Sequence, residues 1–174
     1  MAIPFSFLIL FHLSSIFAAA DMGLIRRTCQ STKYYDLCVS SLQIDPKSLD
    51  SDVPGLATIV TTVAVANATD AYAYLANLTT RTSDASLKWV LRECSNRYRD
   101  AGEALDGSLQ QLQSQTYDYA YVQVTAARDY PNSCHNVFNQ KKQLLYPPAL
   151  QRREQGLVRL CDVALGIIGL LDFD

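Results

Sequence analysis

Five cysteines are the residues of this chain most able to do chemistry, and their spacing divides them into two pairs and one remainder. Cys29 and Cys38 lie nine residues apart, whereas Cys94 and Cys134 lie forty residues apart. Of the three pairings that four cysteines permit, we favour the sequential one, because each bond then lies within or between neighbouring helices. Cys161 is then left as a free thiol. We expect it to be buried and inert; an intermolecular disulfide or a redox role is the alternative.

Residues for a catalytic or metal centre are scarce. The chain has two histidines, and His12 lies in the apolar leader, so a nucleophile–histidine centre would have to be built on His135. We interpret His135 as a surface residue of a helix. Acidic residues occur singly on helix faces, unlike the carboxylate pair of a glycosidase. With four cysteines paired, a zinc site lacks ligands, so we predict no enzyme, no metal and no cofactor.

Two short stretches carry side chains suited to surface recognition. The first places three tyrosines within five residues, at positions 117, 119 and 121, and tyrosine is a favoured interface residue. Core packing is the alternative for some of these rings, because a helix cannot turn all of them toward solvent. The second stretch lies one helix length further along. The candidate target-binding residues of the two stretches are Tyr117, Asp118, Tyr119, Asp129, Tyr130 and Pro131.

The scaffold that positions these residues is predicted to be all-α. Apolar residues recur at steps of three and four from residue 56 onward, as in amphipathic helices. Four helices of roughly 22 to 30 residues with short connections indicate an up-down-up-down four-helix bundle over residues 51–174. Residues 21–50 are too few for a core of their own. They predict an N-terminal helical hairpin stapled by the short cysteine pair, with a turn or linker at 45–48.

Local signals place the four bundle helices. Asp52 and Pro54 mark the start of the first helix, and Asp84 can cap the second. The third is predicted from about residue 117 to 138, with a kink at Pro131, and the fourth from 149 to 171. The residues of the third helix predicted to face inward are Val122, Ala126, Cys134 and Phe138.

The start of the chain is predicted to be an export signal. Residues 1–20 are mostly apolar and end in three alanines before Asp21, which is typical of a cleaved signal peptide and leaves one domain over 21–174. Export leads to a compartment where disulfides persist. Asn67 and Asn77 each begin an N-x-Thr triplet and are candidate glycosylation sites.

Charge and hydropathy narrow the range of partners. The net charge is −2, without the clustered basic excess of a nucleic-acid-binding protein. No second apolar run is long and uninterrupted enough to span a bilayer, so we expect no membrane contact after signal cleavage. A monomer in the secretory pathway is the expected product.

Taken together, these features resemble the plant invertase and pectin methylesterase inhibitor family. The segments that carry the resemblance are residues 29–39, 45–48, 55–57, 117–120 and 126–134, together with the two cysteine spacings and the fifth cysteine. The resemblance covers all of residues 21–174. It implies a disulfide-bonded helical inhibitor that performs no chemistry itself.

The resemblance implies an enzyme as partner, and two enzymes compete for that role. Segments 129–131, 146–148 and 152–154 favour the inhibitors of cell-wall and vacuolar fructosidases, so we expect a protein that caps the active site of an acid invertase in a one-to-one complex. A pectin methylesterase inhibitor in the cell wall is the alternative, followed by an exported helical binding module without inhibitory activity. Apoplast, cell wall and vacuole are the compartments implied.

One departure from the family pattern concerns the docking mode. A cell-wall invertase inhibitor of this family presents a Pro-Lys-Phe motif at the start of the third bundle helix, where this chain has Tyr117, Asp118 and Tyr119. A lysine suits a pocket of carboxylates, whereas an aspartate is repelled by them. We therefore expect contact through the tyrosines and not through an ion pair.

Overall fold

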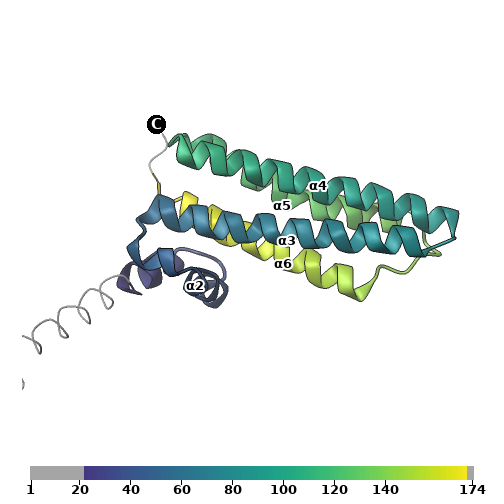
Figure 1. The fold of residues 1–174 in the computed structure, drawn as a ribbon, viewed down its shortest axis with the longest axis horizontal. Coiled ribbons are helices and arrows are strands. Elements are labelled where there is room, and N and C mark those ends of the chain that lie inside the picture. The colour runs from purple at the N-terminus through teal and green to yellow at the C-terminus, as the bar shows by residue number, and fades with distance from the viewer. Residues whose placement is uncertain (1–21, 172–174) are drawn as a thin grey trace, which may run out of the picture.

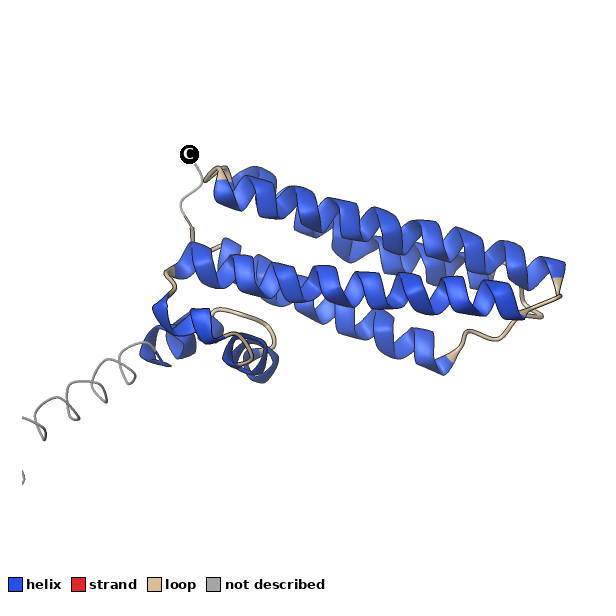
Figure 2. Ribbon diagram, viewed as in Figure 1, coloured by secondary structure: helices blue, strands red, loops and turns tan. Residues whose placement is uncertain are grey.

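The computed structural model describes residues 22–171, and within this range every regular element is helical (Figure 2). The predicted signal peptide and Asp21 lie outside the described residues. Residues 22–30 are helical. The elements that follow are α2 (Tyr35–Gln43), the 3₁₀ helix η1 (Pro46–Asp50), α3 (Val53–Arg81), α4 (Ala85–Gln113), α5 (Tyr117–Asn139) and α6 (Pro148–Ile168).

The four long helices form the predicted up-down-up-down bundle. Helix α3 packs against α4 and α6, and α5 packs against the same two helices, so the chain closes a four-membered ring. Helix α2 lies beside the bundle and packs against α3 and α6 (Figure 1). It marks one end, here called the hairpin end, where α3 and α5 begin and α4 and α6 finish. The predicted hairpin and bundle are confirmed.

Two aspartates fix the helix starts that the sequence predicts. The Asp52 carboxylate accepts a hydrogen bond of 2.9 Å from the Gly55 amide at the start of α3. Asp84 accepts one of the same length from the Leu87 amide at the start of α4. Each bond satisfies an amide that has no partner within the helix. The segment expected to be a turn at 45–48 is the start of η1, whose first turn is capped by Asp45.

Both predicted disulfides are present, and both are buried in the core. Cys29 and Cys38 join the helical segment 22–30 to α2, with Cα atoms 5.6 Å apart. Cys94 and Cys134 join α4 to α5, with Cα atoms 4.6 Å apart. All four residues have no exposed surface. The short bond therefore closes the hairpin, and the long bond ties two neighbouring bundle helices together.

The third bundle helix differs from its expected register. Val122, predicted to face inward, is 64% exposed, and Ala126 is only half-buried. Val124 and Ala127 are buried instead. Steps of four residues back from Phe138 reach position 122, but each step overshoots a helical turn by about 40°. Over four steps the overshoot reaches about 160°, which puts Val122 on the opposite side of the helix.

Candidate functional site

The first turns of α5 expose an apolar surface. Tyr119 and Val122 are each 64% exposed, and a spacing of three residues puts them on the same helix face. Asp118 and Asp129 are also exposed. Their separation of eleven residues brings them back to the same side after about three turns, roughly 16 Å along the axis. We call Asp118, Tyr119, Val122 and Asp129 the α5 stripe.

The structure divides the six candidate target-binding residues into two groups. Asp118, Tyr119 and Asp129 lie on the α5 stripe, where a partner can reach them. Tyr117 and Tyr130 are half-buried and pack against the core, and Pro131 is buried within α5. Val122 belongs to the stripe but was assigned to the core from the sequence.

The turn that leads into the stripe is closed by two backbone hydrogen bonds. The Gln115 amide donates to the Leu112 carbonyl at 3.2 Å, and the Thr116 amide donates to the Gln111 carbonyl at 3.0 Å. This pair of bonds is the Schellman pattern, which places a left-handed residue after the end of a helix, usually glycine. Here the residue is Gln115, with φ of 59°. The junction between α4 and α5 is thus held in one conformation despite the unfavourable residue.

Replacing Gln115 with glycine is expected to raise the free energy of unfolding by about 0.5 kcal/mol. The substitution removes the left-handed strain of a residue with a Cβ, partly offset by the greater freedom of glycine in the unfolded chain. Urea unfolding followed by circular dichroism measures the change. The matched control is Gln110→Gly within α4, which should lower stability by about 1 kcal/mol. A Gln115→Gly variant as destabilised as this control would contradict the interpretation.

Asp118 has a structural use at this position. Helix α5 has Thr116 as its N-cap, whose side chain makes no capping hydrogen bond, and Asp118 is the acidic residue of the first turn. A negative charge there interacts favourably with the partial positive charge of a helix N-terminus. The aspartate therefore stabilises the start of the helix, which explains its presence without a role in contacting the target.

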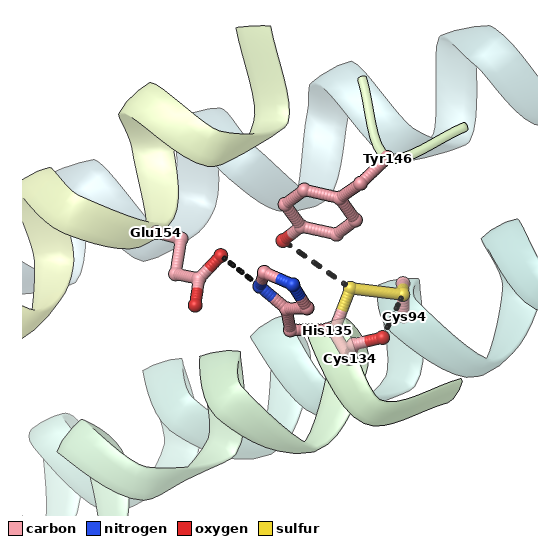
Figure 3. The surroundings of a disulfide bond; sticks show 5 residues. All are labelled: Cys94, Cys134, His135, Tyr146 and Glu154. Atoms are coloured by element: carbon pink, nitrogen blue, oxygen red, sulfur yellow. Dashed lines mark hydrogen bonds and ion pairs between the residues drawn. A yellow bond between two sulfur atoms is a disulfide. The ribbon is translucent and has the colours of Figure 1, made fainter. Parts of the chain in front are cut away.

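His135 lies in a cluster next to the long disulfide (Figure 3). Its Nδ1 is 3.2 Å from Glu154 Oε2 of α6, and its ring stacks on Tyr146 with centroids 4.4 Å apart. The Tyr146 hydroxyl lies 3.9 Å from Cys134 Sγ. Burial raises the pKa of Tyr146, and nearby Tyr98 and Glu154 add to the rise. The expected surface histidine is instead a half-buried contact that joins α5, the following loop and α6.

A second polar link ties three elements together through Asp162 of α6. Arg128 Nε of α5 donates to Asp162 Oδ1, and Lys33 of the hairpin lies 3.5 Å from Asp162 Oδ2. The bond to Asp162 is the main cause that raises the pKa of Arg128. The Asp162 side chain is only 10% exposed. The contacts of Asp162 with Arg128 and Lys33 could not be predicted from the sequence, because the partners are far apart in the chain and form no local motif.

The Cys161 thiol is free and fully buried. Burial, with a further contribution from Asp162, raises its pKa to about 12. Because only the thiolate is nucleophilic, we expect native Cys161 to react with iodoacetamide at pH 8 at least about a hundredfold more slowly than in the urea-unfolded chain with both disulfides intact. Mass spectrometry of timed samples measures the two rates. Equal rates in the two states would contradict an inert thiol.

The two glycosylation triplets occupy different surroundings on α3. Asn77 is exposed, whereas Asn67 is half-buried, and its Oδ1 is buried without a hydrogen-bond partner. The Asn67 amide nitrogen also lies close to Gly156 of α6. We infer that Asn77 is the better glycan acceptor of the two.

Within residues 22–171, no three side chains among His, Cys, Asp and Glu are placed to hold a metal ion. None of the helices described has the length and hydropathy to cross a bilayer. The features gathered so far are two buried disulfides, polar side chains that link the helices, and an exposed α5 stripe with two apolar and two acidic side chains. They define the class of the fold, which is a disulfide-bonded four-helix bundle with an N-terminal helical hairpin.

Comparison with known proteins identifies the family. Residues 23–167 match the family described as plant invertase/pectin methylesterase inhibitor. The chain belongs to this family, whose members are enzyme inhibitors and not enzymes.

Two curated relatives and one solved structure illustrate the match. The chain is 44% identical to cell wall / vacuolar inhibitor of fructosidase 2 of Arabidopsis thaliana, over 85% of this chain and 83% of that protein. It is 42% identical to pectinesterase inhibitor 28 of Oryza sativa subsp. japonica, over 86% of this chain and 69% of that protein. A crystal structure of a mutant pectin methylesterase inhibitor from Arabidopsis superposes on this chain with a TM-score of 0.71 at 22% identity. The superposition covers 84% of this chain and 95% of the other, and it shows that the two share a fold.

Proposed function

We propose that this protein inhibits an acid invertase by covering the active site of the enzyme with the α5 stripe in a one-to-one complex. The observation that carries the proposal is the exposure of Tyr119 and Val122 side by side at the start of α5. Large apolar side chains exposed together on a helix face are characteristic of interaction surfaces. The family membership supplies the kind of partner, which is an enzyme.

Similarity supports invertase as the target. The Arabidopsis relative named as an inhibitor of fructosidase is 44% identical and matched over 83% of its length. The rice relative named as a pectinesterase inhibitor is 42% identical and matched over 69%, which keeps pectin methylesterase as the alternative target. The name of the Arabidopsis relative also supports the cell wall or the vacuole as the place of action.

The charges of the stripe support apolar docking over an ion pair. Asp118 and Asp129 flank Tyr119 and Val122, and both carboxylates are exposed. The Asp129 carboxylate is 3.6 Å from Arg128, which offsets part of its charge. A pocket lined by carboxylates repels Asp118, so the contact that fills the pocket must come from the tyrosine ring and the valine. Asp118→Asn is therefore expected to leave inhibition unchanged or to strengthen it.

The stoichiometry of the complex is tested by size-exclusion chromatography with light scattering. The purified inhibitor is mixed in excess with acid invertase at about pH 5, and the same mixture is prepared with pectin methylesterase. The proposal predicts a free inhibitor of monomer mass and a new invertase peak heavier by one inhibitor per enzyme chain. An invertase peak of unchanged mass, or a shift of the esterase alone, would contradict it.

A further inference from the structure

Within residues 22–171, two serine or threonine hydroxyls bond from one helix to another, and both act at the start of α5. Most other hydroxyls in this range donate to a carbonyl three or four residues earlier. Ser108 of α4 donates to the Ala120 carbonyl of α5 at 3.1 Å. The Thr116 hydroxyl, at the N-cap of α5, bonds to Gln111 near the end of α4. These bonds between helices therefore gather at the base of the α5 stripe.

Ser108 is a polar residue at a core position. It is fully buried on the inward face of α4, between the buried Leu105 and Leu112. A hydroxyl in such a place costs free energy unless it is hydrogen-bonded, and the Ala120 carbonyl is its acceptor. Within the helix that carbonyl also accepts from the amide four residues further on, and the hydroxyl uses its second lone pair. Helix α5 can form without this bond, so the effect of the bond is to fix α5 against α4.

The bond lies directly beside the exposed residues of the stripe. Ala120 is fully buried, whereas Tyr119 before it and Val122 after it are exposed. The first turn of a helix frays readily, and the N-cap Thr116 makes no side-chain capping bond to this turn. The Ser108 hydroxyl keeps the turn against α4 and thereby limits the directions that the Tyr119 ring can take. A contact group that is already ordered loses less conformational freedom on binding, which strengthens the complex.

We propose that Ser108 is a positioning residue of the α5 stripe. Its hydroxyl fixes the first turn of α5 in the orientation in which Tyr119 contacts the enzyme. The inference rests on the inhibition proposed above and adds the group that prepares the contact surface. Because Ser108 is fully buried, it does not touch an enzyme itself and acts only through α5.

A double-mutant cycle tests whether Ser108 acts through Tyr119. Inhibition constants for acid invertase are measured for the native protein, Ser108→Ala, Tyr119→Ala and the variant with both changes. We expect Ser108→Ala to raise the inhibition constant about fivefold, which corresponds to one hydrogen bond. In the Tyr119→Ala background the same change should add less than about twofold, because the ring that Ser108 positions is absent.

The matched control removes a buried hydroxyl that bonds within its own helix. Thr61 of α3 is fully buried and donates to the Ala57 carbonyl at 2.8 Å. Thr61→Val deletes this bond with little change of shape, and it should leave the inhibition constant unchanged. Thermal unfolding followed by circular dichroism checks that Thr61→Val and Ser108→Ala both keep the fold, with a similar small loss of Tm.

Hydrogen exchange measured by NMR gives a second readout, without the enzyme. In Ser108→Ala, the amides of residues 120–124 should exchange about fivefold faster than in the native protein. The amides of residues 134–138 lie at the other end of α5, which the long disulfide joins to α4, and their exchange should be unchanged. Equal exchange at residues 120–124 in the two proteins would overturn the positioning role.

Three results of the inhibition assays would also overturn the proposal. They are an unchanged inhibition constant in Ser108→Ala, the same loss with and without the Tyr119 ring, and a loss in Thr61→Val as large as that in Ser108→Ala. Failure of the native protein to inhibit invertase would refute the proposed function instead. The two failures are distinguishable, because the exchange measurement does not involve the enzyme.

Discussion

Replacing Tyr119 with alanine and Val122 with aspartate in one chain is expected to raise the inhibition constant for acid invertase about a hundredfold or more. The account makes Tyr119 a hot spot of the interface, and truncating such a residue costs about 2 kcal/mol or more, which is about thirtyfold in affinity. The new aspartate adds a charge that would be desolvated against the enzyme. Steady-state inhibition with sucrose as substrate, at about pH 5, measures the effect.

The design separates binding from folding. Tyr119 and Val122 are each 64% exposed, and exposed substitutions away from special features usually change stability by less than about 0.5 kcal/mol. The matched control is Tyr72→Ala, which removes another exposed tyrosine, from α3. The account predicts unchanged thermal unfolding for both variants and unchanged inhibition for the control. Full inhibition by the double variant would show that the stripe is not the contact surface.

Removing the long disulfide is expected to have the largest effect on stability. The variant Cys94→Ala/Cys134→Ala releases a loop closed by residues forty apart, for which loop-closure entropy gives a loss of about 4 kcal/mol. In a domain of this size that loss lowers Tm by about 10 °C. The two cysteines are fully buried, and Tyr146 rests against the bond, so a cavity adds to the loss. Thermal unfolding followed by circular dichroism measures it.

The short disulfide supplies the comparison. Cys29→Ala/Cys38→Ala opens a loop with a separation of nine residues, for which the same relation gives about 2.5 kcal/mol. The account therefore predicts that this variant unfolds at a higher temperature than the variant without the long disulfide. The reverse order would mean that the hairpin, rather than the contact between α4 and α5, limits the stability of the whole fold.

The parts of the fold that could be predicted were encoded locally. Asp52 and Asp84 precede apolar stripes and cap the helices that follow, and both disulfides follow from spacing against those helices. Val122 shows how such reading fails. The face on which a residue lies is set by its angle around the helix axis, and residues spaced by four drift away from one face within a few turns. The wrong assignment of Val122 to the core matters, because this residue lies in the candidate site.

The features that could not be predicted depend on contacts between distant residues. Nothing near His135 in the sequence indicates that Glu154 and Tyr146 will enclose it. The link from Arg128 to Asp162 likewise arises only when α5 and α6 pack together. Gln115 differs again, because a left-handed position is usually signalled by glycine, and this chain places a glutamine there. Three-dimensional packing, and not local propensity, determines each of these features.

The central claim is inhibition of acid invertase, and a paired titration tests it most directly. Increasing amounts of the purified, disulfide-bonded protein are added to fixed amounts of acid invertase and of pectin methylesterase at about pH 5, and the residual activity of each enzyme is measured. The account predicts that invertase activity falls linearly to near zero at one inhibitor per enzyme, while esterase activity stays constant. Loss of esterase activity with invertase untouched would contradict it and assign the protein to the other target of its family.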